Sequence, residues 1–255
     1  MFILGVRFDN LTLLETLAKI RTFISEKKAR VVVTPNVDFL MLARANPYFR
    51  EIVNNGDLNL CDSMPLFWAS RFYGKPLTSR IAGSDLFPKL CQLASEEGYK
   101  IYLFGAMPGI AQETKKKLEA QFPSLSVVGA SSPPPNFNIH SSDTLDILSV
   151  ITQATPDILF VALGPPKQEE FISKYRDHLK IPLSIGVGGA FDFFLGHKKR
   201  APKWLQNMGL EWAHRLFHEP RRLGWRYLMR DSLCPILIGA EILRNAFPFF
   251  FKRRN

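Results

Sequence analysis

The sequence is poor in the residues that build disulfide frameworks and structural metal sites. Its three cysteines, Cys61, Cys91 and Cys234, are odd in number, far apart and never arranged as CxxC. This spacing excludes a disulfide framework and a cysteine-rich zinc site, and it favours a reducing, cytoplasmic environment. The first residues also lack a basic start followed by a long apolar run, so we expect no signal peptide.

Motifs that bind nucleotides or metals in other protein classes are absent as well. The glycines at 105–109 (GAMPG) do not form GxGxxG, the GVGG at 186–189 lacks the third glycine and the acidic residue that should follow, and GxxxxGK[ST] does not occur. No DxD pair of carboxylates is present, and the five histidines show no HExxH spacing. We therefore expect neither a bound metal ion nor a cofactor.

Excess positive charge is almost missing from the first three-quarters of the chain and concentrated in the last quarter. Residues 1–196 carry 20 Lys and Arg against 19 Asp and Glu, which leaves 13 against 4 for residues 197–255. Such a contrast is expected of an appended module that faces an anionic partner. A chain of 255 residues with 46% hydrophobic residues can bury a sizeable core.

Strand-like and helix-like segments alternate through the first 196 residues. A capping box at residues 12–15 (TLLE) begins a helix, and a β-branched run at Val31 to Thr34 predicts a buried strand. This alternation predicts an α/β fold, a Rossmann-like parallel sheet with helices on both faces, plus a helical, basic C-terminal appendage. Further strands are expected at Phe2 to Leu4, Leu58 to Cys61, Lys100 to Phe104, Leu125 to Val128, Ile158 to Leu163 and Leu183 to Val187.

Polar side chains follow several of the predicted strands, where parallel strands share one edge and can converge on a ligand. Asp62 is the candidate general base, because transfer of a group to an alcohol needs a carboxylate to accept the hydroxyl proton. The residues alone leave open a second interpretation, in which Asp62 only caps the helix that begins near Met64. The other strand-end residues are Thr34, Asn36, Gln168 and Asp192.

Short motifs spread over most of the chain occur in a fixed order. They are TPN at 34–36, CDSMP at 61–65, RIAGSDL at 80–86, GPPKQE at 164–169, and FDFFLG, RAPKW, GLEW and RLFHEPRR between 191 and 222. With these motifs the chain resembles the bacterial WecG/TagA/CpsF glycosyltransferases, glycosyltransferase family 26. Ser63 is a departure, since family members often carry glycine there.

The resemblance implies an inverting, metal-independent glycosyltransferase of cell-surface polysaccharide biosynthesis. It would move a hexose-type sugar (N-acetylmannosamine, its uronate, or glucose) from a UDP-sugar to a polyprenyl-diphosphate-linked saccharide. It would act at the inner membrane surface, as a cytoplasmic protein peripherally attached to the inner face of the cell membrane. The implied division is an α/β catalytic core (1–196), a basic helical appendage that completes the active site (197–232), and an amphipathic membrane-associating tail (233–255).

The resemblance also assigns roles to the strand-end residues. Asp62 becomes the base and Thr34 is grouped with it as catalytic, while Asn36 and Gln168 become neutral hydrogen-bonding groups for the substrate. Asp192 is either a second pocket carboxylate or the partner of the basic group at 198–200, and we favour the partner.

Arginines provide the positive charge that a diphosphate needs. Arg80 can hold a diphosphate or a sugar carboxylate bidentately, or it makes a surface ion pair before a helix. Arg215, Arg222 and Arg226 are spaced by 7 and 4, which places them on one helical face that can neutralise a leaving diphosphate. Pro220 begins a new helix and would break that register, and Arg221 is a substitute for one of the three.

The same C-terminal quarter supports a different class of function. Trp204, Trp212, Trp225 and Tyr227 interleave with its basic residues, as in proteins that stack bases and bind phosphates. The alternative is therefore a non-catalytic nucleotide- or nucleic-acid-binding module. As a glycosyltransferase the protein would have no nucleic-acid partner, and a homo-oligomer is left open.

The tail contains an apolar segment, Leu233 to Phe251, of 19 residues. That length approaches the roughly 20 residues that cross a bilayer, but Glu241 and Arg244 lie mid-segment and two prolines interrupt it. We predict a helix lying in the membrane interface, with 249–251 inserting. Its lipid side would be Ile236, Leu237, Ala240, Leu243 and Phe247, and the alternative is that this stripe packs on the core or on a second subunit.

Overall fold

A six-stranded parallel sheet forms the centre of the protein, in the strand order β4-β3-β8-β7-β5-β6. The computed structural model describes residues 1–74 and 76–246, with the side chain of Arg222 outside that description. The expected Rossmann-like sheet is confirmed. Its strands are β3 (Arg30–Val33), β4 (Leu58–Asn59), β5 (Lys100–Gly105), β6 (Ser126–Ser131), β7 (Ile158–Ala162) and β8 (Leu183–Gly186).

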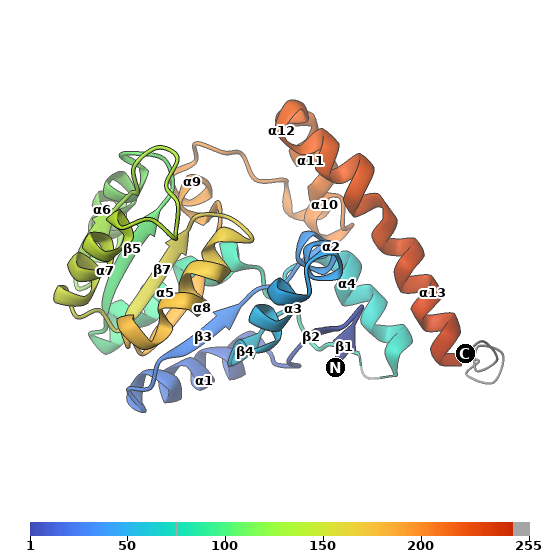
Figure 1. The fold of residues 1–255 in the computed structure, drawn as a ribbon, viewed down its shortest axis with the longest axis horizontal. Coiled ribbons are helices and arrows are strands. Elements are labelled where there is room, and N and C mark those ends of the chain that lie inside the picture. Colours follow the sequence, from blue (N-terminus) through green and yellow to red (C-terminus); the bar gives the residue numbers. More distant parts are fainter. Residues whose placement is uncertain (75, 247–255) are drawn as a thin grey trace.

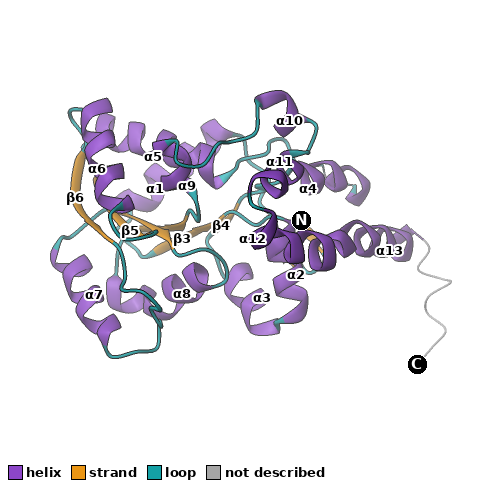
Figure 2. Cartoon of the chain, turned by 90° about the horizontal axis from the view of Figure 1, so that it is seen from above, coloured by secondary structure: helices purple, strands orange, loops and turns teal. Residues whose placement is uncertain are grey.

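Helices cover both faces of this sheet (Figure 2). One face carries α1 (Leu13–Ser25), α5 (Gly83–Glu97), α6 (Ile110–Gln121) and α9 (Ala190–Leu195). The other face carries α2 (Val37–Ala45), α3 (Pro47–Asn54), α7 (Asp143–Gln153) and α8 (Lys167–Leu179). The N-terminus forms an antiparallel hairpin of β1 (Phe2–Ile3) and β2 (Val6–Arg7), where we expected one strand.

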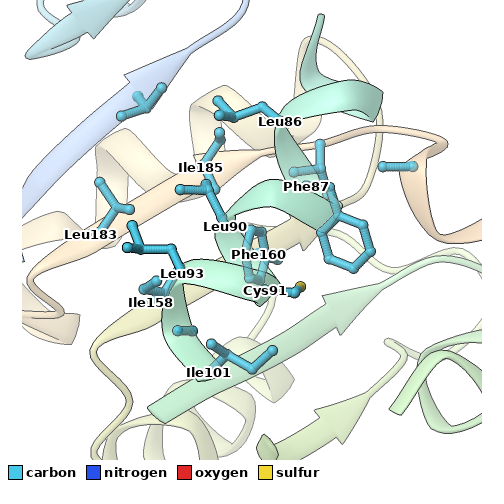
Figure 3. Close-up of a cluster of buried hydrophobic side chains, with 14 of the residues drawn as sticks. Leu86, Phe87, Leu90, Cys91, Leu93, Ile101, Ile158, Phe160, Leu183 and Ile185 are labelled. Carbon is cyan, nitrogen blue, oxygen red and sulfur yellow. The ribbon is translucent and has the colours of Figure 1, made fainter. Parts of the chain in front are cut away.

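The packing of α5 on the sheet shows why the alternating pattern folds this way (Figure 3). Residues at 86, 87, 90 and 93 recur every three or four positions and form one apolar face. They pack on inward-facing side chains of β5, β7 and β8, including Ile101, Ile158 and Leu183, which are fully buried. The rings of Phe87 and Phe160 meet edge to face with centroids 4.9 Å apart.

Local capping signals set several helix starts. The backbone amide of Thr12 donates to Glu15 Oε2 at 2.7 Å, and the Glu15 amide donates to Thr12 Oγ1 at 3.3 Å, so the expected capping box is confirmed. Asn36 caps α2, a helix that the sequence pattern did not predict, by accepting from the amide of Phe39 at 3.3 Å. This cap fixes the orientation of a residue that lies at the end of β3.

The C-terminal segment is helical, as expected, and lies beside the start of α2 and the helix that follows β4 (Figure 1). Pro220 is the first residue of a new helix, so the anticipated break in register is confirmed. The elements are α4 (Met64–Ala69) and η1 (Ser70–Tyr73) after β4, then α10 (Lys203–Asn207), α11 (Glu211–His218), α12 (Pro220–Trp225), η2 (Arg226–Arg230), η3 (Asp231–Leu233) and α13 (Cys234–Ala246). We call α10 through α13 the appendage; it combines most of the predicted appendage (197–232) with the described part of the predicted tail (233–246).

Candidate active site

A cavity of about 730 Å³ separates the carboxyl ends of β3 and β4 from the appendage. The start of α2 and the α4–η1 segment form one wall, and residues of the appendage form the other. Five of the predicted catalytic and substrate-binding residues line this cavity: Asn36, Asp62, Arg80, Arg215 and Arg226. The rule that polar residues at strand ends converge therefore holds for Asn36 and Asp62, and the appendage closes the space above them.

Asp62 follows β4 and is held by its neighbour from β3. Asn36 Nδ2 donates to Asp62 Oδ2 at 3.3 Å, and Asn36 Oδ1 accepts from the amide of Phe39 to cap α2. The side-chain amide of Asn36 therefore has only one orientation. The N-cap of α4 is Ser63, and it makes no side-chain cap hydrogen bond. The interpretation of Asp62 as a helix cap is therefore wrong, and its carboxylate faces the cavity.

The surroundings of Asp62 bring its pKa into the range of a general base. Burial and, to a lesser extent, the carboxylate of Glu211 raise the pKa of Asp62, while Arg215, Arg80 and the Asn36 hydrogen bond lower it, and together they bring it to about 6. A carboxylate with a pKa near 6 is mostly ionised at neutral pH and still basic enough to take a proton in a transition state. The geometry and the charge of Asp62 are thus compatible with proton abstraction.

Glu211, at the first position of α11, gathers the cations of the cavity and was not singled out in the sequence. Its Oε1 accepts from Arg215 Nη2 at 2.6 Å and lies 3.8 Å from Arg200 Nε, and its Oε2 lies 4.0 Å from Arg80 Nη1. Glu211 therefore lies among three guanidinium groups, of which Arg80 and Arg200 also pair with Asp85. The only sequence signal was the acidic residue of GLEW, four positions before Arg215.

Some N–H groups of the arginines in and beside the cavity make no hydrogen bond inside the protein. The Nε atoms of Arg200, Arg215 and Arg226 are buried without a hydrogen bond. The Nε of Arg200 lies 3.8 Å from Glu211 Oε1 and that of Arg226 lies 3.6 Å from Asp231 Oδ2, so the Nε of Arg215 is the donor best suited to an oxygen of an anionic ligand. Within residues 1–74 and 76–246, no group of three or more His, Cys, Asp and Glu side chains is placed to hold a metal ion.

Glu211→Gln is expected to move the acidic limb of the activity profile to lower pH. The limb reflects ionisation of Asp62 near pH 6, and the substitution removes a negative charge that raises that pKa. The measurement is kcat/KM against pH for the parent and the variant, with Glu97→Gln on α5 as the control. A limb that stays in place in Glu211→Gln would show that Asp62 does not govern it.

Arg226 lines the cavity and also fastens the appendage to α2. Its Nη1 donates to Asp38 Oδ2 at 3.3 Å, its Nε lies 3.6 Å from Asp231 Oδ2, and Arg230 pairs with both carboxylates. Arg226 therefore reaches the cavity from η2 and Arg215 from α11, rather than from one helical face. The third predicted arginine, Arg222, lies in α12, and its side chain is outside the described residues.

The remaining candidates, Thr34 at the end of β3 and Gln168 and Asp192 after other strands, do not line this cavity. Thr34 is buried, and its Oγ1 is 3.0 Å from where a Cβ on Gly83, the first residue of α5, would lie. Asp192 makes a 3.6 Å ion pair with Lys198, which confirms the partner that we favoured. Arg200 pairs instead with Asp85, donating from Nη2 to Oδ2 at 2.9 Å.

Gln168 bridges two strand-end loops. Its Oε1 accepts from the amides of Gly164 after β7 (3.1 Å) and Gly188 after β8 (3.0 Å). Its Nε2 donates to Glu169 Oε1 at 2.6 Å, and burial raises the pKa of Glu169 to about 8, so that carboxyl group is mostly neutral at pH 7. Gln168 therefore sets the position of both loops, a role that only the fold reveals.

Known proteins are similar in sequence to this protein over nearly the whole chain. A sequence profile described as the glycosyl transferase WecG/TagA/CpsF family matches residues 1–247. The chain is 35% identical over 208 residues to an N-acetylglucosaminyldiphosphoundecaprenol N-acetyl-beta-D-mannosaminyltransferase of Bacillus spizizenii. These 208 residues are 82% of this chain and 78% of that protein. A protein of the same name from Staphylococcus aureus is 29% identical over 227 residues, which is 87% of this chain and 86% of that protein. The match to the profile includes both the strand ends and the appendage.

Proposed function

The chain belongs to the WecG/TagA/CpsF family of glycosyl transferases, and from this premise we propose an inverting, metal-independent transfer of a sugar from a UDP-sugar to a polyprenyl-diphosphate-linked saccharide. The protein is an enzyme of cell-wall polysaccharide synthesis. The names of its relatives support N-acetylmannosamine as the transferred sugar and N-acetylglucosaminyl-diphosphoundecaprenol as the acceptor. Because the chain belongs to an enzyme family, we prefer this function to the alternative of a non-catalytic nucleotide- or nucleic-acid-binding module.

The observation that carries this proposal is a carboxylate of raised pKa beside a cluster of arginines in one cavity. In the proposed reaction Asp62 accepts the proton of the acceptor hydroxyl, whose oxygen attacks the anomeric carbon from the face opposite the leaving group. The bond between that carbon and the diphosphate oxygen breaks, and UDP departs with the electron pair. A single displacement of this kind inverts the anomeric configuration.

Arginine supplies the charge stabilisation that the departing diphosphate needs. Arg80, Arg215 and Arg226 line the cavity, and we include Arg222 on the strength of the family resemblance. Fixed guanidinium groups stabilise developing negative charge without a metal ion because they are already oriented before the reaction. We further propose that Asn36 orients Asp62, and that Thr34, Gln168 and Asp192 shape the strand-end edge that receives the donor.

The proposal is tested by incubating the protein with a panel of UDP-sugars and a short-chain N-acetylglucosaminyl-diphospholipid. We expect one sugar to be transferred with release of UDP, inversion of the anomeric centre by NMR, and full activity in EDTA. UDP-glucose and UDP-N-acetylglucosamine serve as controls for donor selectivity. Absence of transfer from every donor would contradict the proposed reaction, and loss of activity in EDTA would contradict metal independence.

Membrane attachment concerns the outer side of α13. No helix in the described ranges 1–74 and 76–246 has the length and apolar character to cross a membrane. Ile236 and Leu243 are 68% and 56% exposed, whereas Leu237 packs against the core, so its predicted place on the lipid side is wrong. We propose that the exposed row on α13 rests on the inner membrane surface; the predicted contribution of residues 247–255 lies outside the described residues.

Anionic liposomes are expected to carry the full-length protein upward in a flotation gradient at low salt, and less of it at high salt. The basic surplus of residues 197–255 provides an attraction that salt screens, and the apolar row adds insertion. Deletion of 233–255 should abolish flotation, and Ile236→Gln with Leu243→Gln should reduce it. A matched control is Leu145→Gln with Val150→Gln, which alters two exposed apolar residues on α7. A parent protein that stays in the soluble fraction at low salt would contradict the attachment.

A further inference from the structure

The cavity that holds Asp62 has a second half with a different character. Beyond the charged end its walls are almost entirely apolar. The α4–η1 segment contributes Leu66, Trp68, Ala69 and Phe72, and α13 contributes Pro235, Ile238, Gly239 and Ile242. We call this half the α4–α13 groove. A polar site that continues into an apolar groove fits a ligand with a charged head and a hydrocarbon chain.

The two walls of the groove run side by side in both views of the molecule (Figures 1 and 2). The lining positions of α13, at 234, 235, 238, 239 and 242, share one helical face and extend over about 12 Å at 1.5 Å per residue. The far end is fixed by Glu241, whose Oε2 accepts from Tyr73 Oη at 2.5 Å and from the amide of Leu4 at 2.8 Å. The groove is thus a preformed channel that leads away from Asp62.

Large apolar side chains in the groove lack protein cover. Phe72 is 71% exposed and Trp68 is 37% exposed, although both face a cavity of the protein. Exposed apolar surface of this kind marks a binding site when it is continuous and concave. The opposite end of the same cavity contains Arg226 and Arg215, and the buried Nε of Arg215 makes no hydrogen bond. The apolar and the cationic features belong to one continuous space.

We propose that the α4–α13 groove binds the isoprenoid units that adjoin the diphosphate of the acceptor. This inference rests on the proposed function, because it takes the lipid-linked acceptor as given and assigns the site of its chain. The acceptor sugar then lies at Asp62 and its first isoprenoid units between α4–η1 and α13, so its diphosphate shares the arginine-lined end of the cavity with the diphosphate of the donor. A lipid acyl chain or a second copy of the protein would cover the apolar half but would place no diphosphate at the arginine-lined half.

The chain contains a position that can close the groove without disturbing the protein. Gly239 lines the groove, and a Cβ added there meets no atom within 4 Å. Gly239→Phe therefore fills the channel from within, and it replaces a poor helix former with a better one. The matched control is Ala240→Phe, which places the same side chain on an exposed position of the same helix. Phe72→Ala is a second variant, which removes one wall at an exposed and therefore tolerant position.

The test compares binding of farnesyl diphosphate and of inorganic pyrophosphate by calorimetry, without any sugar donor. The parent and Ala240→Phe should bind farnesyl diphosphate at least about tenfold more tightly, because burial of several methylene groups adds to the diphosphate contact. Gly239→Phe should reduce that ratio to about threefold or less, and Phe72→Ala should reduce it in part. Binding of pyrophosphate should stay the same in all four proteins.

Two results would overturn the inference: equal affinity of the parent for both compounds, or an unchanged ratio in Gly239→Phe and Phe72→Ala. Because no sugar is transferred in this experiment, its outcome is separate from that of the activity assay. A protein that prefers farnesyl diphosphate but transfers no sugar would leave the groove in place and contradict the proposed reaction. A protein that transfers sugar but binds farnesyl diphosphate no better than pyrophosphate would support the proposed reaction and contradict the isoprenoid site.

Discussion

Asp62→Asn is expected to lower turnover by roughly 10² to 10⁴-fold, the range that a positioned general base contributes. Asn cannot accept the proton of the acceptor hydroxyl, but its oxygen can still accept the hydrogen bond that Asn36 donates at 3.3 Å. The cationic groups that we assign to the diphosphate are unchanged, so affinity for UDP should remain near the parent value. Turnover and UDP affinity are measured separately, by steady-state kinetics and by calorimetry.

The thermal stability of Asp62→Asn distinguishes a chemical role from a structural one. The folded state raises the pKa of Asp62 to about 6, so the Asp62 carboxyl group stabilises the fold in its protonated form. This contribution is fully present below the unfolded-state pKa and is lost as the pH rises through about 6. At pH 7 the neutral amide removes an unfavourable charge, so the melting temperature should equal or exceed that of the parent. Asp177→Asn, at an exposed position of α8, is the control. Turnover at the parent rate would show that Asp62 is not the base.

The parallel sheet was predictable because its signals are local. Strands such as β7 are short, continuous apolar runs between helices, and a chain of that pattern has few ways to bury both faces of each strand. The β1–β2 hairpin was not predicted because its two strands have two residues each, too few for a recognisable period. Helix α2 was missed because the Thr-Pro-Asn sequence before it was interpreted as the end of a strand, while Asn36 is in fact a helix cap.

The active site was predictable only in part, and the limit is tertiary contact. Asn36 and Asp62 were found because strand ends meet at one edge of a parallel sheet. The cationic cluster centred on Glu211 depends on how α11 lies over that edge, and no local pattern encodes this position. The groove between α4 and α13 depends on the pairing of Tyr73 with Glu241, which are 168 residues apart in the chain.

Removal of the appendage from Leu205 onward is expected to leave a folded but inactive α/β core. Of the three clusters of buried apolar residues described, the first and third lie within the core and keep all their members. The second cluster loses Cys234 and Ile238, and Asp38 loses the two arginines that neutralise it in a buried position. We therefore expect a lower melting temperature but a retained sheet, as seen by circular dichroism.

Activity should disappear in the truncated protein because one wall of the cavity is gone. The deletion removes Glu211, Arg215 and Arg226, together with the α13 side of the groove. Within the full chain, Arg222→Ala and Arg226→Ala should each weaken transfer, since the leaving diphosphate loses an oriented donor. Arg230→Ala is the matched comparison, because Arg230 pairs with Asp38 and Asp231 as Arg226 does but does not line the cavity.

The comparison of Arg226→Ala with Arg230→Ala separates charge in the site from attachment of the appendage. If the arginines act only by fastening the appendage to α2, both variants should lose activity and stability to a similar degree. If Arg226 also stabilises the departing diphosphate, Arg226→Ala should lower kcat much more than Arg230→Ala does, while the two variants have similar melting temperatures. Full activity of the truncated protein with a water-soluble acceptor would show that the core alone holds the active site, and would remove the appendage from the mechanism.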